Sequence, residues 1–437
     1  MRKPCLVLAA ALLACAAFSD GDLKILFTER EFEAGGGRVA LTNTSGPIYR
    51  ATVDYVAEKP LALVVRPPHN AFMGLWRHTL PAAPEPRRET CDFTVWALSS
   101  DAEFRIEGGG ARQIRKLAVE TISDKEYRPS TTIPNPARKN NARHAKIKRD
   151  YAAAPPHPVV LFGDSLTDNW RGARFAYMTT NFPVVNAGIC GDRIEHLLWR
   201  IEDMRDLLTN NPPSVATLLI GTNNFGLDSG YTDIGRGILN LVTTLRTICP
   251  ETRIVVFGIP PRALSWRKAA LPFPQAENGF LASYLGSRDL GGRFFFFDFS
   301  PLLLENGGTY LCGYDGGDIR TEFYERDALH FSDRGYADVV TPFVAGAIRL
   351  AIAKNLPPDY MKRMWQWAEY LRRRRQGTGI NFALEEMLAC EAHLAALPGH
   401  WMKVFSKLEA DPDYAPEMPD EYLRQEREEG LPDLSGF

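Results

Sequence analysis

Short apolar runs alternate with amphipathic stretches from residue 159 to about residue 350. Helical periodicity between the runs is clearest at residues 192–208 and 233–248. Strands that alternate with helices predict a parallel sheet covered by helices. We therefore expect an α/β domain over residues 158–353, with strands at 159–162, 184–186, 216–220, 254–258 and 294–298.

A different pattern precedes this domain, between residues 21 and 122. Short runs of alternating apolar and polar residues recur there, separated by turns that contain glycine and proline. Several strands with turn signals between them predict a small all-β sandwich or jelly roll. The expected strands span residues 23–27, 38–41, 49–55, 61–65, 93–98 and 113–120.

Two segments that flank the α/β domain carry weaker patterns. Residues 123–157 are rich in proline and basic residues and are interpreted as a linker. Residues 354–437 are predicted to be a helical C-terminal extension, with helices at 361–375 and 382–397. The proline-containing stretch after residue 411 is expected to be extended.

The first 20 residues have the pattern of a signal peptide. Arg2 and Lys3 precede an apolar stretch at residues 5–17, which is too short to span a bilayer. Cleavage at the A-x-A-like site around Cys15 and a lipobox that lipidates Cys15 remain alternatives, and a buried N-terminal element is a third. We expect an exported protein, periplasmic or secreted, either soluble or lipid-anchored, and no transmembrane span.

The composition excludes several classes of protein. Of the 437 residues, 45% are hydrophobic and 24% are charged, and the formal net charge is -2. This is enough apolar material for a core without disulfides or metals, and the charge does not suit nucleic-acid binding. No CxxC pair occurs, which disfavours zinc and redox motifs. We expect no metal, cofactor or nucleic-acid partner, while the disulfide pairing and oligomeric state stay open.

The end of the first α/β strand carries the run Gly163-Asp164-Ser165-Leu166. A serine at a strand's carboxyl end, just before a helix, lies beside backbone N–H groups that stabilise anions. Serine also needs a positioned base. Asp327, three residues before His330, can accept the imidazole N–H and fix its tautomer. Ser165, His330 and Asp327 are the candidate catalytic residues.

Two later strand ends offer donors for an oxyanion. Gly191 follows the second strand and can present a bare backbone N–H. Asn223 follows the third strand and carries a side-chain amide. With the N–H of Ser165, these groups form the candidate oxyanion hole.

These motifs resemble the four sequence blocks of the SGNH/GDSL hydrolases. The blocks are GDSL at 163–166, Gly191, GTN at 221–223 and DALH at 327–330. The elements G-x-x-G-D at 188–192 and LWR at 198–200 most resemble the platelet-activating-factor acetylhydrolase α-subunit branch. The resemblance covers about residues 159–352 and implies a flavodoxin-like, three-layer domain. Cys190 stands where those relatives often have glycine, which leaves the size of the acyl group open.

The resemblance implies a serine ester hydrolase that works through an acyl-enzyme without a metal. Ser165 would be the nucleophile, His330 the general acid and base, and Asp327 its orienting partner. Export and a preceding β domain, an arrangement that some carbohydrate esterases share, favour removal of acetyl groups from a carbohydrate. The expected partner is therefore an acetylated glycan or other small ester. The alternatives are a lipid or arylester hydrolase of the lysophospholipase or acetylhydrolase kind, and a non-catalytic glycan-binding or scaffolding protein.

Overall fold

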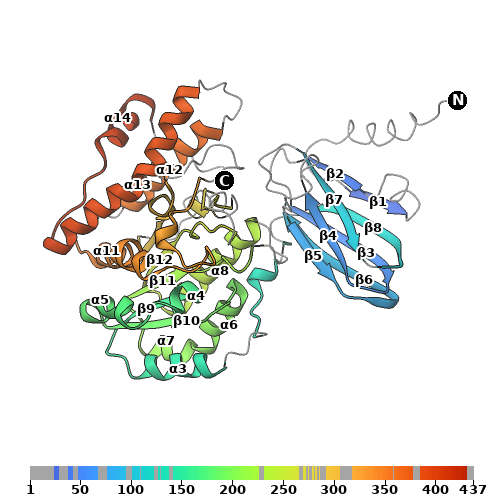
Figure 1. Cartoon of the computed structure of the whole chain (residues 1–437), viewed down its shortest axis with the longest axis horizontal. Coiled ribbons are helices and arrows are strands. Elements are labelled where there is room, and N and C mark those ends of the chain that lie inside the picture. The colour runs from blue at the N-terminus through green and yellow to red at the C-terminus, as the bar shows by residue number, and fades with distance from the viewer. Residues whose placement is uncertain are drawn as a thin grey trace. The chain divides into compact units, whose positions relative to one another are not determined.

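A computed structural model of the chain divides into two compact units, residues 1–130 with 226–233 and residues 131–225 with 234–437. Each unit is described by itself (Figure 1). The predicted signal peptide and Cys15 lie outside the described residues. The described residues are 24–28, 38–42, 48–66, 76–94, 101–108, 110–122, 126–127, 129–136, 141–225, 231–264, 269–271, 274, 278–279, 281–282, 285, 292–305, 317–357, 359–376 and 384–430.

The first unit contains two antiparallel sheets of four strands each, in the orders β1-β8-β3-β6 and β2-β7-β4-β5. This eight-stranded, two-sheet arrangement is a jelly roll, so the predicted β domain is confirmed. The strands are β1 (Lys24–Thr28), β2 (Arg38–Thr42), β3 (Ile48–Ala57), β4 (Leu61–Arg66), β5 (Trp76–Leu80), β6 (Ala83–Thr94), β7 (Asp101–Gly108) and β8 (Arg112–Ile122).

Aromatic side chains join the two sheets of this unit. Phe93 of one sheet stacks on Phe104 of the other at 5.6 Å between ring centroids, and Tyr49 stacks on Phe93 at 5.4 Å. Strands β5 and β7 and most of β6 were not expected from the sequence. Strand β6 has prolines at its second and fourth positions and is largely polar, which argues against a central strand. It lies at the edge of its sheet, where proline and exposed side chains are tolerated.

The second unit is built on a five-stranded parallel sheet in the order β10-β9-β11-β12-β13. This is the flavodoxin-like order of a doubly wound α/β fold, as predicted. Figure 1 shows helices on both sides, with α5 and α11 on one and α6 and α8 on the other. The strands are β9 (Val159–Gly163), β10 (Val184–Gly188), β11 (Val215–Leu219), β12 (Arg253–Phe257) and β13 (Phe294–Phe297).

The helices carry the labels of Figure 1. They are α3 (Asn141–Ala152), α4 (Ser165–Asp168), α5 (Ala173–Asn181), α6 (Ile194–Asp203), α7 (Arg205–Asn210), α8 (Tyr231–Ile248), α10 (Asp333–Gly335), α11 (Thr341–Ile352), α12 (Tyr360–Gln376), α13 (Leu384–Ala410) and α14 (Asp420–Glu429). Short 3₁₀ turns occur at Ser130–Thr132, Ser300–Leu303 and Thr321–Phe323, and a π-helical turn at Tyr336–Val340.

The structure differs from the predicted linker at residues 141–152, which form helix α3. Ile147 and Tyr151 of this helix are buried in the core of the second unit. The Tyr151 hydroxyl donates to the Asn211 carbonyl at 2.6 Å. The spacing of His144, Ile147 and Tyr151, all buried, follows the helical period. Basic residues between these three positions make the helical period hard to recognise in the sequence.

The C-terminal extension is part of the same core. Trp401 of α13 packs edge-on against Phe297 of β13 at 4.9 Å, and Phe405 contacts Phe343 of α11 at 5.2 Å. The prediction of an extended final stretch is wrong at residues 420–429, which form α14. Pro419 precedes that helix, and Asp420 and Glu421 occupy its first turn. Proline is tolerated at a helix start, and acidic residues there favour the dipole.

One described helical segment, Asp333–Ile352, is long and apolar enough to cross a membrane by length and composition. In the protein, 72% of its apolar window is buried. Packing in the core therefore accounts for its composition.

Gly346 decides how closely α11 and α13 approach. A Cβ at this position would lie 2.2 Å from the Phe405 ring, so we expect Gly346→Ala to lower the free energy of unfolding by about 1–3 kcal/mol through overpacking. Gly399→Ala on α13 is the control, because nothing lies within 4 Å of its added carbon. That variant should gain up to about 1 kcal/mol from helix propensity. Urea unfolding measures both, and effects of the same sign would contradict the packing argument.

Candidate active site

Ser165 lies where the interior strand β9 turns into the short helix α4. Asp164 is the N-cap, and its Oδ1 accepts the Leu166 N–H at 2.9 Å. Ser165 is 6% exposed, so neighbouring residues enclose most of its surface. The N–H groups of Leu166, Thr167 and Asp168 all bond to Asp164, so the N–H of Ser165 itself is the donor that this turn offers to an anion.

His330 approaches Ser165 from the loop before α10. Its Nε2 lies 2.8 Å from Ser165 Oγ, and its Nδ1 lies 2.5 Å from Asp327 Oδ2. The other carboxylate oxygen of Asp327 accepts the backbone N–H groups of Leu329 and His330, each at 3.0 Å. A continuous chain of hydrogen bonds thus links Ser165 through His330 to Asp327, as predicted. Ser165 and His330 are 165 residues apart in the sequence.

The backbone of this loop is shaped for the Asp–His contact. Ala328 has a φ of +56°, a left-handed conformation that costs a non-glycine residue about 1 kcal/mol. This turn lets Asp327 fold back onto the two following N–H groups. Burial acts to raise the pKa of Asp327, but the hydrogen bonds from His330 and the backbone outweigh it and hold the pKa below its ordinary value. Asp327 is therefore a carboxylate at neutral pH.

The predicted oxyanion donors lie at the same edge of the sheet. Gly188 and Leu219 both pair with Gly163, so the segments carrying Gly191 and Asn223 leave the sheet level with the Ser165 turn. Gly191 has a φ of +72°, which suits glycine. Its N–H makes no hydrogen bond within the described part of the chain.

Asn223 is tied to the same turn. Its Nδ2 donates to the Asp192 carbonyl at 2.9 Å, directly after Gly191. An amide nitrogen carries two protons, so one remains for an oxyanion. The structure thus ties Asn223 to the residue that follows Gly191, and it connects Ser165 to His330.

Arg200 of α6 organises the strand ends beneath these donors. Its guanidinium donates to the carbonyls of Ala187 and Gly163, at 2.8 Å and 3.2 Å, and to Asp192 Oδ2 at 2.7 Å. Arg200 and Asp192 are 3% and 2% exposed. Arg200 stands in the LWR motif at residues 198–200, but the motif by itself gives it no role.

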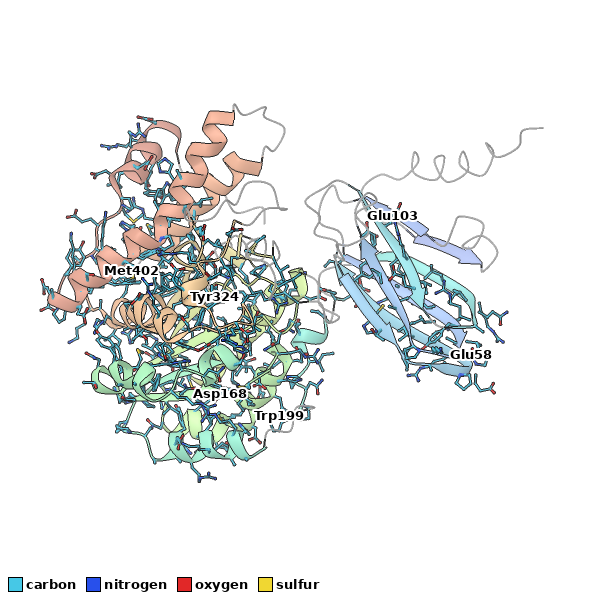
Figure 2. All side chains as sticks on the ribbon, in the orientation of Figure 1. Glu58, Glu103, Asp168, Trp199, Tyr324 and Met402 are labelled. Atoms are coloured by element: carbon cyan, nitrogen blue, oxygen red, sulfur yellow. The ribbon has the colours of Figure 1, made fainter. Side chains whose placement is uncertain are left out.

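A second arginine, missed from the sequence, comes from α3. Arg143 donates to the carbonyls of Gly188 at 3.1 Å and Asn186 at 3.0 Å. It also pairs with Asp168 Oδ1 at 3.0 Å; Asp168 is labelled in Figure 2. Oδ2 of Asp168 accepts the Cys190 N–H at 3.2 Å. Arg143 therefore holds both ends of the turn that leads to Gly191.

A buried tyrosine ties the nucleophile helix to the helical segment after His330. The Tyr336 hydroxyl donates to the Leu166 carbonyl at 2.7 Å, and its ring stacks on Trp170 at 5.8 Å. His196 has a structural role at the start of α6, because its Nδ1 accepts the Arg193 N–H at 3.1 Å.

Two titratable residues near Ser165, Cys190 and Asp164, have raised pKa values. Burial, the hydrogen bond to Asp168 and the charge of Asp168 raise the pKa of Cys190 to about 11, so this thiol stays protonated at neutral pH and is a poor nucleophile. Burial also raises the pKa of Asp164 to about 7, with a contribution from Asp192. Asp164 Oδ2 has no hydrogen-bond partner among the described residues.

Comparison with known families places this geometry in context. Residues 161–337 match the model of the GDSL-like Lipase/Acylhydrolase family. The rat platelet-activating factor acetylhydrolase IB subunit alpha2 is 32% identical over 197 residues, which cover 42% of this chain and 74% of the relative. The bovine subunit alpha1 is 29% identical over 200 residues, which cover 44% of this chain and 75% of the relative.

Alignments to solved structures cover more of the chain. A family two carbohydrate esterase from Clostridium thermocellum aligns over 75% of this chain and 99% of its own. The sequence identity is 13% and the TM-score is 0.29. This likeness concerns the fold alone.

We expect Arg143→Ala to lower kcat for p-nitrophenyl acetate about 10- to 100-fold while KM changes little, because the turn carrying Gly191 loses three contacts. Arg143→Lys should recover little of the lost kcat, since the point charge of a lysine cannot replace the several directed N–H donors of the guanidinium group. Arg149→Ala removes an exposed arginine from the same helix and is the control. An unchanged kcat in folded Arg143→Ala would contradict the role of this contact.

Asp164 should make stability depend on pH. Its pKa is about 7 in the folded protein against an ordinary value of 3.8, so the folded state keeps a proton that the unfolded state has lost. Stability from this group therefore falls as pH rises between these values. Asp164→Asn keeps the cap acceptor and removes the titration.

The unfolding free energy of Asp164→Asn, relative to wild type, is expected to rise by roughly 2–3 kcal/mol between pH 5 and pH 8. Urea unfolding at both pH values measures this difference. The exposed Asp206→Asn is the matched control. A relative stability that stays constant with pH would show that Asp164 is ionised throughout the range.

Proposed function

The chain belongs to the GDSL-like lipase/acylhydrolase (SGNH/GDSL hydrolase) family, and on that premise we propose that it removes short acyl groups, acetyl above all, from a carbohydrate. As a member of this family it is an esterase or acylhydrolase. The observation that carries the proposed mechanism is the hydrogen-bonded chain from Ser165 Oγ through His330 to Asp327.

In the proposed mechanism, Ser165 Oγ attacks the ester carbonyl carbon while His330 Nε2 takes the hydroxyl proton. Asp327 keeps the imidazole in the tautomer that exposes a free Nε2 and stabilises the imidazolium that forms. The tetrahedral intermediate collapses to the acyl-enzyme, and the leaving alcohol takes the proton from His330. Water then attacks the acyl-enzyme, with His330 as base, and releases the carboxylic acid and free Ser165.

The negative charge of each tetrahedral intermediate falls on the former carbonyl oxygen. We assign its stabilisation to the N–H groups of Ser165 and Gly191 and the Asn223 amide. Removing one such donor in other hydrolases costs about 10²–10³-fold in kcat. The contacts that Arg200 and Arg143 make with the strand ends position the turns that carry these donors.

Two observations support a short acyl group on a sugar. The curated relatives are named acetylhydrolases, which favours acetyl as the acyl group. The jelly-roll unit precedes the catalytic unit, and jelly rolls are an architecture of lectin domains, which favours a glycan as the carrier. Export of the chain remains a prediction that agrees with an extracellular glycan.

A lipid ester is the second candidate, because the same relatives are named for platelet-activating factor. In that case the acyl group would still be acetyl and the carrier would differ. A non-catalytic glycan-binding protein is disfavoured, because Ser165 and His330 are within hydrogen-bonding distance.

We expect acetate release to be faster from acetylated xylan and acetylated sugars than from platelet-activating factor, and faster from p-nitrophenyl acetate than from p-nitrophenyl octanoate. Ser165→Ala should lose at least 10³-fold in kcat on every substrate. Ser406→Ala, a surface serine on α13, is the control and should stay within about twofold.

The outcomes separate the candidates. Preference for the lipid would replace the carbohydrate proposal and keep the mechanism. Wild-type activity in folded Ser165→Ala would overturn the mechanism itself.

A further inference from the structure

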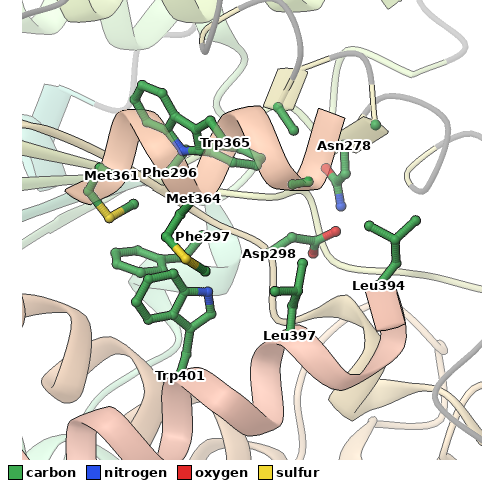
Figure 3. Close-up of a pocket in the computed structure, with 13 residues that line it drawn as sticks. Asn278, Phe296, Phe297, Asp298, Met361, Met364, Trp365, Leu394, Leu397 and Trp401 are labelled. Atoms are coloured by element: carbon green, nitrogen blue, oxygen red, sulfur yellow. The ribbon is translucent and has the colours of Figure 1, made fainter. Parts of the chain in front are cut away.

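A cavity distinct from Ser165 lies between the C-terminal helices and the edge strand β13. It has a volume of about 100 Å³. Figure 3 shows Trp365 and Met364 of α12 on one side, Leu397 and Trp401 of α13 facing them, and Asp298 at the flank. An apolar cavity of roughly 150 Å³ accommodates benzene in another protein, so this smaller space admits at most a single ring or a short alkyl group.

The cavity and the catalytic serine share a sheet edge but not a site. Asp298 directly follows β13, whereas Ser165 follows β9, and β11 and β12 lie between these strands. Three strand spacings correspond to about 14 Å. A ring-sized molecule in the cavity therefore does not reach Ser165.

One polar group on the cavity wall lacks a partner. Trp365 is 9% exposed, and its indole N–H has no acceptor among the described residues. A buried donor without an acceptor is costly, and folded proteins rarely retain one. Asn278, the neighbouring amide, is already used: it exchanges hydrogen bonds with the Ile259 N–H at 2.7 Å and carbonyl at 2.9 Å. The vacant hydrogen bond thus belongs to Trp365.

The lining also selects the charge of a ligand. No lysine, arginine or histidine is among the described lining residues, and Asp298 contributes a carboxylate. An anion would be repelled, and a cation would leave the Trp365 N–H without an acceptor. An uncharged hydroxyl can accept from Trp365, and its proton can be donated to a carboxylate.

We infer that this cavity binds a small, uncharged alcohol whose apolar body is the size of one aromatic ring. The apolar body lies against the methionine, leucine and tryptophan side chains, and the hydroxyl oxygen takes the hydrogen bond of Trp365. This site is additional to the ester-cleaving centre, and its occupancy does not depend on the identity of the ester.

Benzyl alcohol and ethylbenzene test the inference, because they have the same size and differ by a hydroxyl in place of a methyl group. Binding to the purified full chain is measured by ligand-observed NMR titration. We expect wild type to bind benzyl alcohol in the low millimolar range, as the ligand has few atoms. Trp365→Phe removes the N–H donor and keeps an aromatic ring. It should weaken the binding of benzyl alcohol about five- to tenfold and the binding of ethylbenzene less than twofold.

Trp367→Phe on the same helix is the matched control, because Trp367 does not line the cavity; it should leave both affinities unchanged. Ala368→Leu adds carbon atoms within the lining and should weaken both probes at least tenfold. If that variant does not fold, Leu397→Phe replaces it.

Three outcomes would overturn the inference: no binding by wild type, equal weakening of both probes in Trp365→Phe, or binding unaffected by a folded cavity-filling variant. Because binding is measured directly, none of them bears on whether Ser165 hydrolyses an ester.

Discussion

The candidate active site of this protein depends on one buried guanidinium. Arg200 donates to the carbonyls that end β9 and β10 and to the carboxylate of Asp192. The Gly163 carbonyl also accepts the Ile189 N–H at 3.2 Å, so Arg200 gives this oxygen a second hydrogen bond where the chain departs from the sheet. A buried ion pair of this kind contributes little net stability relative to apolar packing, but it tolerates few geometries. Its effect is to hold the Ser165 turn and the Gly191 turn in one arrangement.

The other residues of the site are positioned in two ways: some by the strands of the sheet, and others by contacts within a single loop. The strands place Ser165, Gly191 and Asn223 at the same edge of the sheet, because the ends of β9, β10 and β11 are in register. The Asp327–His330 contact is local and depends on one left-handed residue, Ala328. Arg143 adds a contact from outside the segment that matches the family, residues 161–337. Helix α3 is therefore part of the catalytic unit.

The C-terminal helices α12 and α13 cover the edge strand β13 of the parallel sheet. Strand β13 is at the edge of the parallel sheet, and a bare edge invites pairing with other chains. Trp365 packs on Phe294 at 5.2 Å and Trp401 on Phe297 at 4.9 Å, so α12 and α13 cover this strand with aromatic rings. Rings on two helices do not fill the space between them completely, and the cavity beside Trp365 is the result.

The sequence by itself determined the α/β pattern and the catalytic candidates. Buried parallel strands are continuous apolar runs, and Ser165, Asp327 and His330 stand in short motifs whose chemistry is local. Edge strand β6, helix α14 and the roles of Arg143 and Arg200 were decided only by the tertiary structure. Prolines in β6 are tolerated because of its place in the sheet. An arginine becomes a positioning residue only when folding brings distant carbonyls to it, and no local pattern records which carbonyls those are.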